Sequence, residues 1–296
     1  MPSEASRRPD GTPHQAFVLR YRACDPEARL GLPSGRFTNA SAASSLLLAI
    51  ASLAVVYGVL FALRTRPGFS TAWEYLTGFA GIPIPMAFLA AWATAILLLK
   101  SLKIRAQRAA LRLRFMPTDP GFTVSSATAE RLIEAIETSV EEPERFMVLA
   151  RVLRALKSVR NVGRVADVDE MLATRAEQDE NIVEGGYTLV RGFVWAIPVL
   201  GFIGTIVGLT AAISRFGGVL GQPGLALESI TAQLTEVIAG LDTAFVTTGE
   251  GLVAALAIHL LQVFVRRQDE TFLDEVREAT TAEIVARVRL VAAKEG

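Results

Sequence analysis

The sequence predicts an all-α membrane protein with four transmembrane helices and long cytoplasmic helical extensions. Hydrophobic residues make up 51% of the chain, and its mean hydropathy is +0.38, which soluble globular domains rarely reach. Three uncharged apolar stretches and a longer fourth one can each cross a hydrocarbon core of about 30 Å as a helix. The four stretches are 45–63, 82–99, 192–213 and 238–265. A buried core helix could explain one such stretch, but not four in one short chain.

Charge and rare residues exclude several classes of function. The 30 basic and 30 acidic residues cancel, so no basic excess supports binding to nucleic acid. Cys24 is the single cysteine, which makes an intramolecular disulfide impossible. The only histidines are His14 and His259, and no tight Cys/His cluster predicts a metal site. We therefore expect no metal and no cofactor.

Lysine and arginine alternate between the segments that flank the apolar stretches, and this pattern predicts the topology. The counts are six in 1–43, two in 64–81, fourteen in 100–188, one in 214–237 and six after residue 265. Positive charge marks the cytoplasmic side, so both termini and the long middle segment should be cytoplasmic in a bacterial inner membrane. The first stretch follows 43 residues, too many for a signal peptide, and we expect it to be retained as an anchor.

This topology divides the chain into five parts. They are an N-terminal cytoplasmic arm (1–43), transmembrane helices 1 and 2 (44–99), a cytoplasmic helical domain (100–188), transmembrane helices 3 and 4 that form a pore (189–265) and a cytoplasmic C-terminal helix (266–296). In the cytoplasmic domain, Ser125 or Ser126 can cap a helix, and Glu142-Pro143 should interrupt it. A second helix is expected over 163–188.

The third span carries three glycines on one helix face. Gly201, Gly204 and Gly208 are spaced by three and four residues, a pattern that lets a neighbouring backbone come close. Such patterns are common in membrane helices, so this one alone is a weak signal. Pro198 lies one turn earlier and should bend or loosen the helix.

The fourth span carries polar side chains that a membrane does not readily accept. Thr243, Thr247 and Glu250 are spaced to share one helix face, and Thr248 lies beside them. A glutamate in the membrane interior costs about 2.5–3.5 kcal/mol on insertion scales, so it should face other helices or water. Glu250 could form an inter-helix hydrogen bond or belong to an ion path. Each threonine could instead bond to the carbonyl four residues earlier.

Two other polar residues of the fourth span have simpler interpretations. Asp242 is near the outer end and can reach the membrane interface, and His259 is near the cytoplasmic end, where an interfacial histidine is expected. Neither residue requires a role in ion transfer.

Threonines of the third and fourth spans are expected at the same depth. Thr205, Thr247 and Thr248 should all lie about 12–15 Å from the outer face, at 1.5 Å per residue. Hydroxyl groups at one level could form a polar belt in a ring of subunits. Because hydroxyls do not titrate near neutral pH, a carboxylate is also needed, from Glu250 or from a second protein.

Two segments resemble a known family. IPVLGFIGTIVGL (197–209) and LDTAFVTTGEGLVAAL (241–256) are similar to the last two spans of the MotA/TolQ/ExbB proton channel family, and the four-span layout resembles MotA. The resemblance implies a homopentamer around a pore that holds two copies of a single-span MotB/TolR/ExbD-like protein. That partner would supply the aspartate that carries H⁺ or Na⁺.

The same resemblance assigns roles to individual residues. Thr205 and Thr248 match the pore-lining threonines of the family, whereas Thr243 falls where ExbB-like members carry a pore glutamate. Glu250 has no counterpart in the family pattern.

Two functions are compatible with these patterns, and a third is not. The first is an ion-channel or stator subunit that uses proton or sodium motive force to drive mechanical work across the envelope. The alternative is a non-conducting membrane scaffold. An enzyme is not expected, since the P-loop, G-x-S-x-G and H-E-x-x-H motifs are missing from the sequence, and no catalytic residue is predicted.

Overall fold

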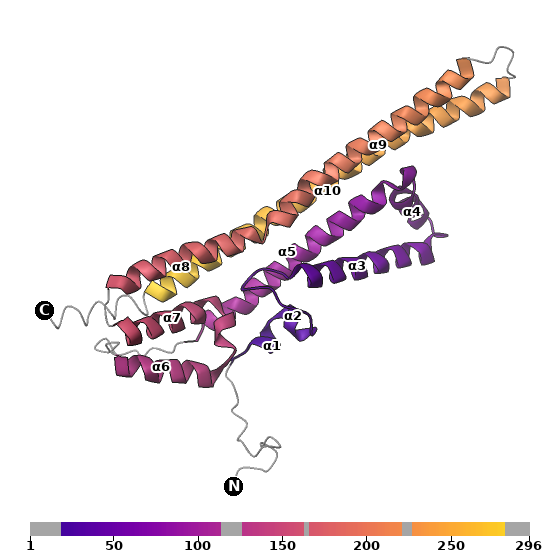
Figure 1. The fold of residues 1–296 in the computed structure, drawn as a ribbon. Coiled ribbons are helices and arrows are strands. Elements are labelled where there is room, and N and C mark those ends of the chain that lie inside the picture. Colours follow the sequence, from indigo (N-terminus) through magenta and orange to yellow (C-terminus); the bar gives the residue numbers. More distant parts are fainter. Residues whose placement is uncertain (1–18, 114–125, 163–165, 221–226, 282–296) are drawn as a thin grey trace, which may run out of the picture. The chain divides into compact units, whose positions relative to one another are not determined.

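The fold is helical, as predicted. The structure is a computed structural model that describes residues 19–113, 126–162, 166–220 and 227–281 (Figure 1). Within these ranges the only strands are β1 (Leu19–Arg20) and β2 (Val140–Glu141). The chain divides into two compact units, which we call the apolar unit, because it contains the apolar stretches, and the polar unit.

The apolar unit comprises Ala42–Leu98 and Tyr187–Val265. Its elements are α3 (Ala42–Leu63), α4 (Phe69–Thr77), the 3-10 helix η2 (Phe79–Gly81), and parts or all of α5 (Pro83–Leu111), α9 (Thr188–Leu220) and α10 (Leu227–Thr280). The helices α3, α5, α9 and α10 are long and apolar enough to cross a membrane. Large apolar side chains point outward along them, which suits a lipid environment. The protein is therefore a multi-pass membrane protein.

The helices α3, α9 and α10 each contain a predicted apolar stretch, α5 begins one residue after the start of its stretch, and all four extend beyond the prediction. The difference is largest for α10, which begins at Leu227 and continues to Thr280. Hydropathy locates only the part of a helix that lipid can surround. Backbone hydrogen bonding continues into polar sequence because each residue added to an existing helix gains one further bond.

Two hydrogen bonds tie the first helices of the apolar unit together. The indole nitrogen of Trp92 on α5 donates to the Ser45 hydroxyl of α3 over 3.1 Å. Near the other end of α3, the Tyr57 hydroxyl donates to the carbonyl of Leu76 over 3.1 Å. Gly68, with φ +85°, makes the turn before α4, a conformation that a side chain would disfavour.

The polar unit comprises Met1–Ser41, Leu99–Gly186 and Arg266–Gly296. Its elements are β1, α1 (Tyr21–Cys24), α2 (Pro26–Arg29), α6 (Ser126–Ser139), β2, η3 (Pro143–Arg145), α7 (Met147–Val162) and α8 (Ala166–Gly185), together with the ends of α5 and α10. β1 pairs with β2 in parallel, with Leu19 opposite Val140. This two-residue pairing was not predicted, because so short a strand leaves no periodic pattern in the sequence.

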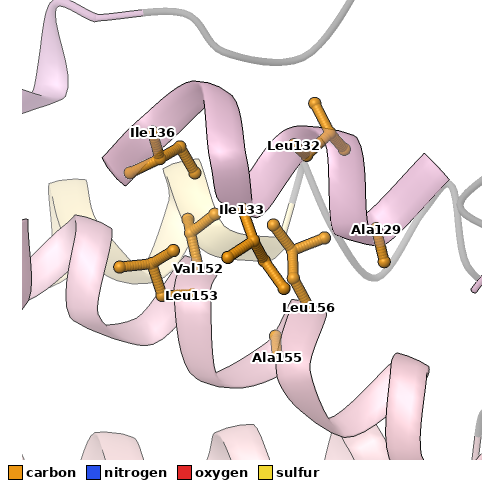
Figure 2. Packing of buried hydrophobic residues seen from close by; sticks show 8 residues of the cluster. All are labelled: Ala129, Leu132, Ile133, Ile136, Val152, Leu153, Ala155 and Leu156. Carbon is orange, nitrogen blue, oxygen red and sulfur yellow. The ribbon is translucent and has the colours of Figure 1, made fainter. Parts of the chain in front are cut away.

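The core of the polar unit lies between α6 and α7. The helix α6 begins at Ser126, which is therefore its first helical residue, and the preceding Ser125, the other predicted cap, lies outside the described residues. The interruption at Glu142-Pro143 is also confirmed, and Glu142 adopts a left-handed conformation with φ 53°. The chain turns there, and apolar side chains of both helices interdigitate (Figure 2). The buried cluster consists of Ala129, Leu132, Ile133, Ile136, Val152, Leu153, Ala155 and Leu156.

A buried ionic network fastens the arm to α5. The Lys103 ammonium contacts the carboxylates of Asp25 at 3.3 Å and Glu27 at 2.7 Å. It also donates to the Ser34 hydroxyl and to the Gly35 carbonyl, each over 2.9 Å. All three charged side chains are at most 2% exposed. The 19–41 part of the predicted arm is therefore held in place by a compensated charge cluster.

Two groups of this network have shifted pKa values. Burial would raise the pKa of Asp25, but its hydrogen bond from the Ala28 N–H and the nearby Lys103 ammonium outweigh burial, so the pKa lies below its ordinary range. Burial raises the pKa of Tyr21 to about 12. The neutral Tyr21 hydroxyl donates to Asp25 Oδ2 over 2.7 Å.

Candidate ion-pathway site between two membrane helices

Glycines allow α9 and α10 to approach each other closely. A Cβ atom at Gly208 would lie 2.5 Å from the carbonyl oxygen of Gly240, and one at Gly201 would lie 2.8 Å from the carbonyl oxygen of Thr247. A Cβ atom at Gly204 would meet the side chain of Thr247. The three glycines singled out in the third span thus all lie against α10.

The α10 side of this contact was missed by the sequence analysis. Gly240, Ala244 and Gly251 are buried against α9, and their spacing of four and seven residues keeps them on one helix face. That recurrence of small residues in the fourth span was the available signal. Pro198 lies at this contact too, with its Cα 3.6 Å from the position of a Cβ on Gly251. Proline has no N–H group, so the Val194 carbonyl lacks its helical donor.

Close approach brings two hydroxyl groups together. Thr205 of α9 and Thr248 of α10 form a hydrogen bond in which either oxygen can be the donor. The Thr205 hydroxyl can also donate to the Ala244 carbonyl over 3.0 Å, and the Thr248 hydroxyl to the Gly201 carbonyl over 3.2 Å. Each hydroxyl can therefore bond to the backbone of the opposite helix, in place of the carbonyl four residues earlier in its own helix.

The hydroxyl pair has more hydrogen-bond contacts than protons. Thr205 and Thr248 own one hydroxyl proton each, yet they make three contacts: one with each other and one with each opposing carbonyl. If Thr205 donates to Ala244, Thr248 can donate to Thr205. If Thr248 donates to Gly201, Thr205 can donate to Thr248. The pair therefore has two hydrogen-bond arrangements that differ in direction, as a relay of water or protons requires.

The other two threonines of the fourth span are bonded to their own helix. The Thr243 hydroxyl donates to the Ala239 carbonyl over 2.9 Å, and the Thr247 hydroxyl donates to the Thr243 carbonyl over 2.8 Å. The Thr247 hydroxyl also lies 3.4 Å from the Gly201 carbonyl, and its residue is fully buried. For these two residues the structure has the local backbone bond that the sequence left open as an alternative.

Glu250 lies on a different flank of α10 from the hydroxyl pair. It lies two positions after Thr248, so the two side chains leave the helix about 160° apart at 100° per residue. The residue is partly buried, and its Oε2 atom is buried without a hydrogen-bond partner among the described residues. Asp242 and His259, at either side of it along the helix, are exposed.

The described residues hold no group of three or more His, Cys, Asp or Glu side chains arranged for a metal ion. Around the Thr205–Thr248 pair, the polar atoms that join α9 and α10 are hydroxyl and carbonyl oxygens. Such neutral oxygens can orient water or a partly dehydrated cation, and they do not exchange protons at neutral pH by titration.

Comparison with known proteins agrees with the family resemblance of the last two spans. The model of the MotA/TolQ/ExbB proton channel family matches residues 138–278, which include α7, α8, α9 and nearly all of α10. This is a family of channels rather than of enzymes. Neither curated proteins nor solved structures give a match to this chain. With four membrane-capable helices and this matched region, the chain is shown to carry the MotA/TolQ/ExbB proton channel family domain.

Proposed function

We propose that this protein is the ion-channel subunit of a motor in a bacterial inner membrane, driven by proton or sodium motive force. The observation that carries the proposal is the pair of hydroxyls at Thr205 and Thr248, joined across α9 and α10 with two alternative hydrogen-bond arrangements. Membrane helices that only pack against each other do not require such a pair. A wet pathway can use it, because such a pathway must accept and release hydrogen bonds as water or ions pass.

The exposure of this pair in a single chain supports assembly into a ring. Thr205 and Thr248 are half-buried, so one side of the pair faces away from its own chain. Lipid cannot hydrogen-bond to it. We propose a homopentamer in which the pairs line a central pore, around two copies of a single-span MotB/TolR/ExbD-like protein whose aspartate carries the ion.

The alternation of basic charge supports the orientation within the membrane. Fourteen lysines and arginines lie in 100–188, against one in 214–237. The proposal therefore places both termini and the polar unit in the cytoplasm. Ion flow would turn the ring about the partner dimer and drive mechanical work across the envelope.

The test is ion-driven flux through the full complex with its partner, reconstituted in vesicles under an imposed H⁺ or Na⁺ gradient. Thr205→Val and Thr248→Val keep the side-chain shape but remove the hydroxyl, and flux should be lost. Thr205→Ser and Thr248→Ser are matched controls that keep the hydroxyl and should conduct. Size-exclusion chromatography of each variant checks that the ring still forms. Wild-type flux in both valine variants would overturn the proposed pathway.

A non-conducting scaffold is the alternative, and one observation favours it. Both hydroxyls have a carbonyl acceptor on the opposite helix, so they could serve only to join α9 to α10. In that case the valine variants would weaken assembly, and the wild-type complex would show no gradient-dependent flux. The same reconstitution therefore separates the two functions.

A further inference from the structure

Glu250 is an ionisable side chain of a membrane helix that the hydroxyl pathway does not use. Its Oε2 atom is buried and has no hydrogen-bond partner among the described residues. A charged carboxylate with one buried, unpaired oxygen is costly, because low-dielectric surroundings stabilise a charge much less than water does. Protonation removes the charge and leaves an O–H group with a smaller desolvation cost.

The surroundings of Glu250 offer no counter-ion. No ion pair involving Glu250 occurs among the described side chains. On its own helix the nearest ionisable side chains are Asp242 and His259, eight and nine residues away, or about 12–14 Å along the axis. Both are exposed. Neither is close enough to pair with the buried Oε2 atom of Glu250.

On α3, the Tyr57 hydroxyl lies close enough to interact electrostatically with Glu250. That hydroxyl already donates its only proton to the Leu76 carbonyl. Tyr57 therefore does not supply the missing hydrogen bond in this arrangement.

We propose that Glu250 is a second proton-binding site of the apolar unit, on the flank of α10 away from the Thr205–Thr248 pair. Its ligand is a single proton, which the carboxylate takes up and releases. The assignment of this proton to ion flow rests on the function proposed above. It gives this chain a titratable group of its own, in addition to any carboxylate that a partner contributes.

Labelling with dicyclohexylcarbodiimide tests the site, because this apolar reagent reacts with protonated carboxyl groups within the membrane. The full complex in its membrane is treated over a range of pH, and the adduct is located by peptide mass spectrometry. We expect an adduct at Glu250 that decreases as pH rises. Asp242, exposed on the same helix, serves as the internal comparison and should be labelled much less.

Two variants complete the test. Glu250→Gln should lose the adduct and lose the pH dependence of flux, and Glu250→Asp should restore both in part. Asp242→Asn is the matched control and should change neither. Wild-type labelling is independent of variant folding, so absence of an adduct at Glu250 at every pH overturns the inference. Unchanged flux and pH profile in an assembled Glu250→Gln complex would also overturn it.

The outcomes separate this inference from the function on which it rests. If the wild-type complex shows gradient-driven flux but Glu250 is never labelled, the inference fails and the channel function stands. If Glu250 is labelled but the wild-type complex shows no flux, the proton site stands and the channel function fails.

Discussion

Replacing Lys103 by methionine should release the N-terminal arm from α5. The Lys103 ammonium holds two carboxylates that are almost completely buried, those of Asp25 and Glu27. Methionine fills a similar volume but leaves both charges unpaired. Removing one partner from a buried ion pair costs about 3–5 kcal/mol. Since backbone N–H groups of Ala28 and Gly35 still bind these carboxylates, we expect the lower end of that range.

A cost of about 3 kcal/mol raises the population with a released arm roughly a hundredfold, at 1.4 kcal/mol per factor of ten. Phe37 reports this release, because it is only 3% exposed and chymotrypsin can cut there only after the arm opens. When opening and closing are fast, the cleavage rate follows the open population. The rate at Phe37 in membranes should therefore rise by a similar factor.

Two further variants make the assay specific. Arg22→Gln removes the exposed ion pair with Glu142, whose side chains are 76% and 36% exposed. Because exposed pairs contribute about 0–1 kcal/mol, it should scarcely change cleavage. Adding Asp25→Asn and Glu27→Gln to Lys103→Met removes the unpaired charges and should recover much of the protection. Equal cleavage of Lys103→Met and wild type would refute the ionic attachment.

Two other predictions concern the helix contact and the titration of the arm. Gly204→Ala should destabilise the α9–α10 pair by about 1–3 kcal/mol, as overpacking does, since its Cβ would collide with Thr247. Gly192→Ala has open space around its Cβ and should be neutral or slightly stabilising in detergent unfolding; equal stability of the two variants would contradict the close contact. The pKa of Tyr21 is raised from 10.0 to about 12, so its stabilisation is complete below pH 10 and is lost as pH rises towards 12. The tyrosinate absorbance difference between wild type and Tyr21→Phe measures this midpoint, and a value near 10 would contradict burial of the hydroxyl.

Much of the helical organisation could be predicted because its determinants are local. Uncharged runs of suitable length located α3, α5 and α9, and Glu142-Pro143 located the break between α6 and α7. Helix lengths were predicted less well, since a helix can continue through polar residues once it has formed. The short β1–β2 pairing depends on two segments about 120 residues apart, and no local pattern indicates it.

The candidate site also has a part that the sequence predicted and a part that it did not. The rise per residue put Thr205 and Thr248 at one depth, but depth does not decide which side chains meet. The rotation of each helix about its axis decides which side chains meet. The contacts of Gly201, Gly204 and Gly208 with α10 fix that rotation. As a result Thr247 is buried against α9 while Glu250 is turned away from the hydroxyl pair.

The sequence by itself determined the membrane class, the four spans and the polar residues within them, because hydropathy and helical spacing are properties of neighbouring residues. Only the tertiary structure decided the partners of those residues. Lys103 meets Glu27 across 76 positions of the chain, and Thr205 meets Thr248 across 43. Such pairs form when packed helices bring distant backbones together, and close packing at glycines selects one rotation among the several that the sequence pattern permits.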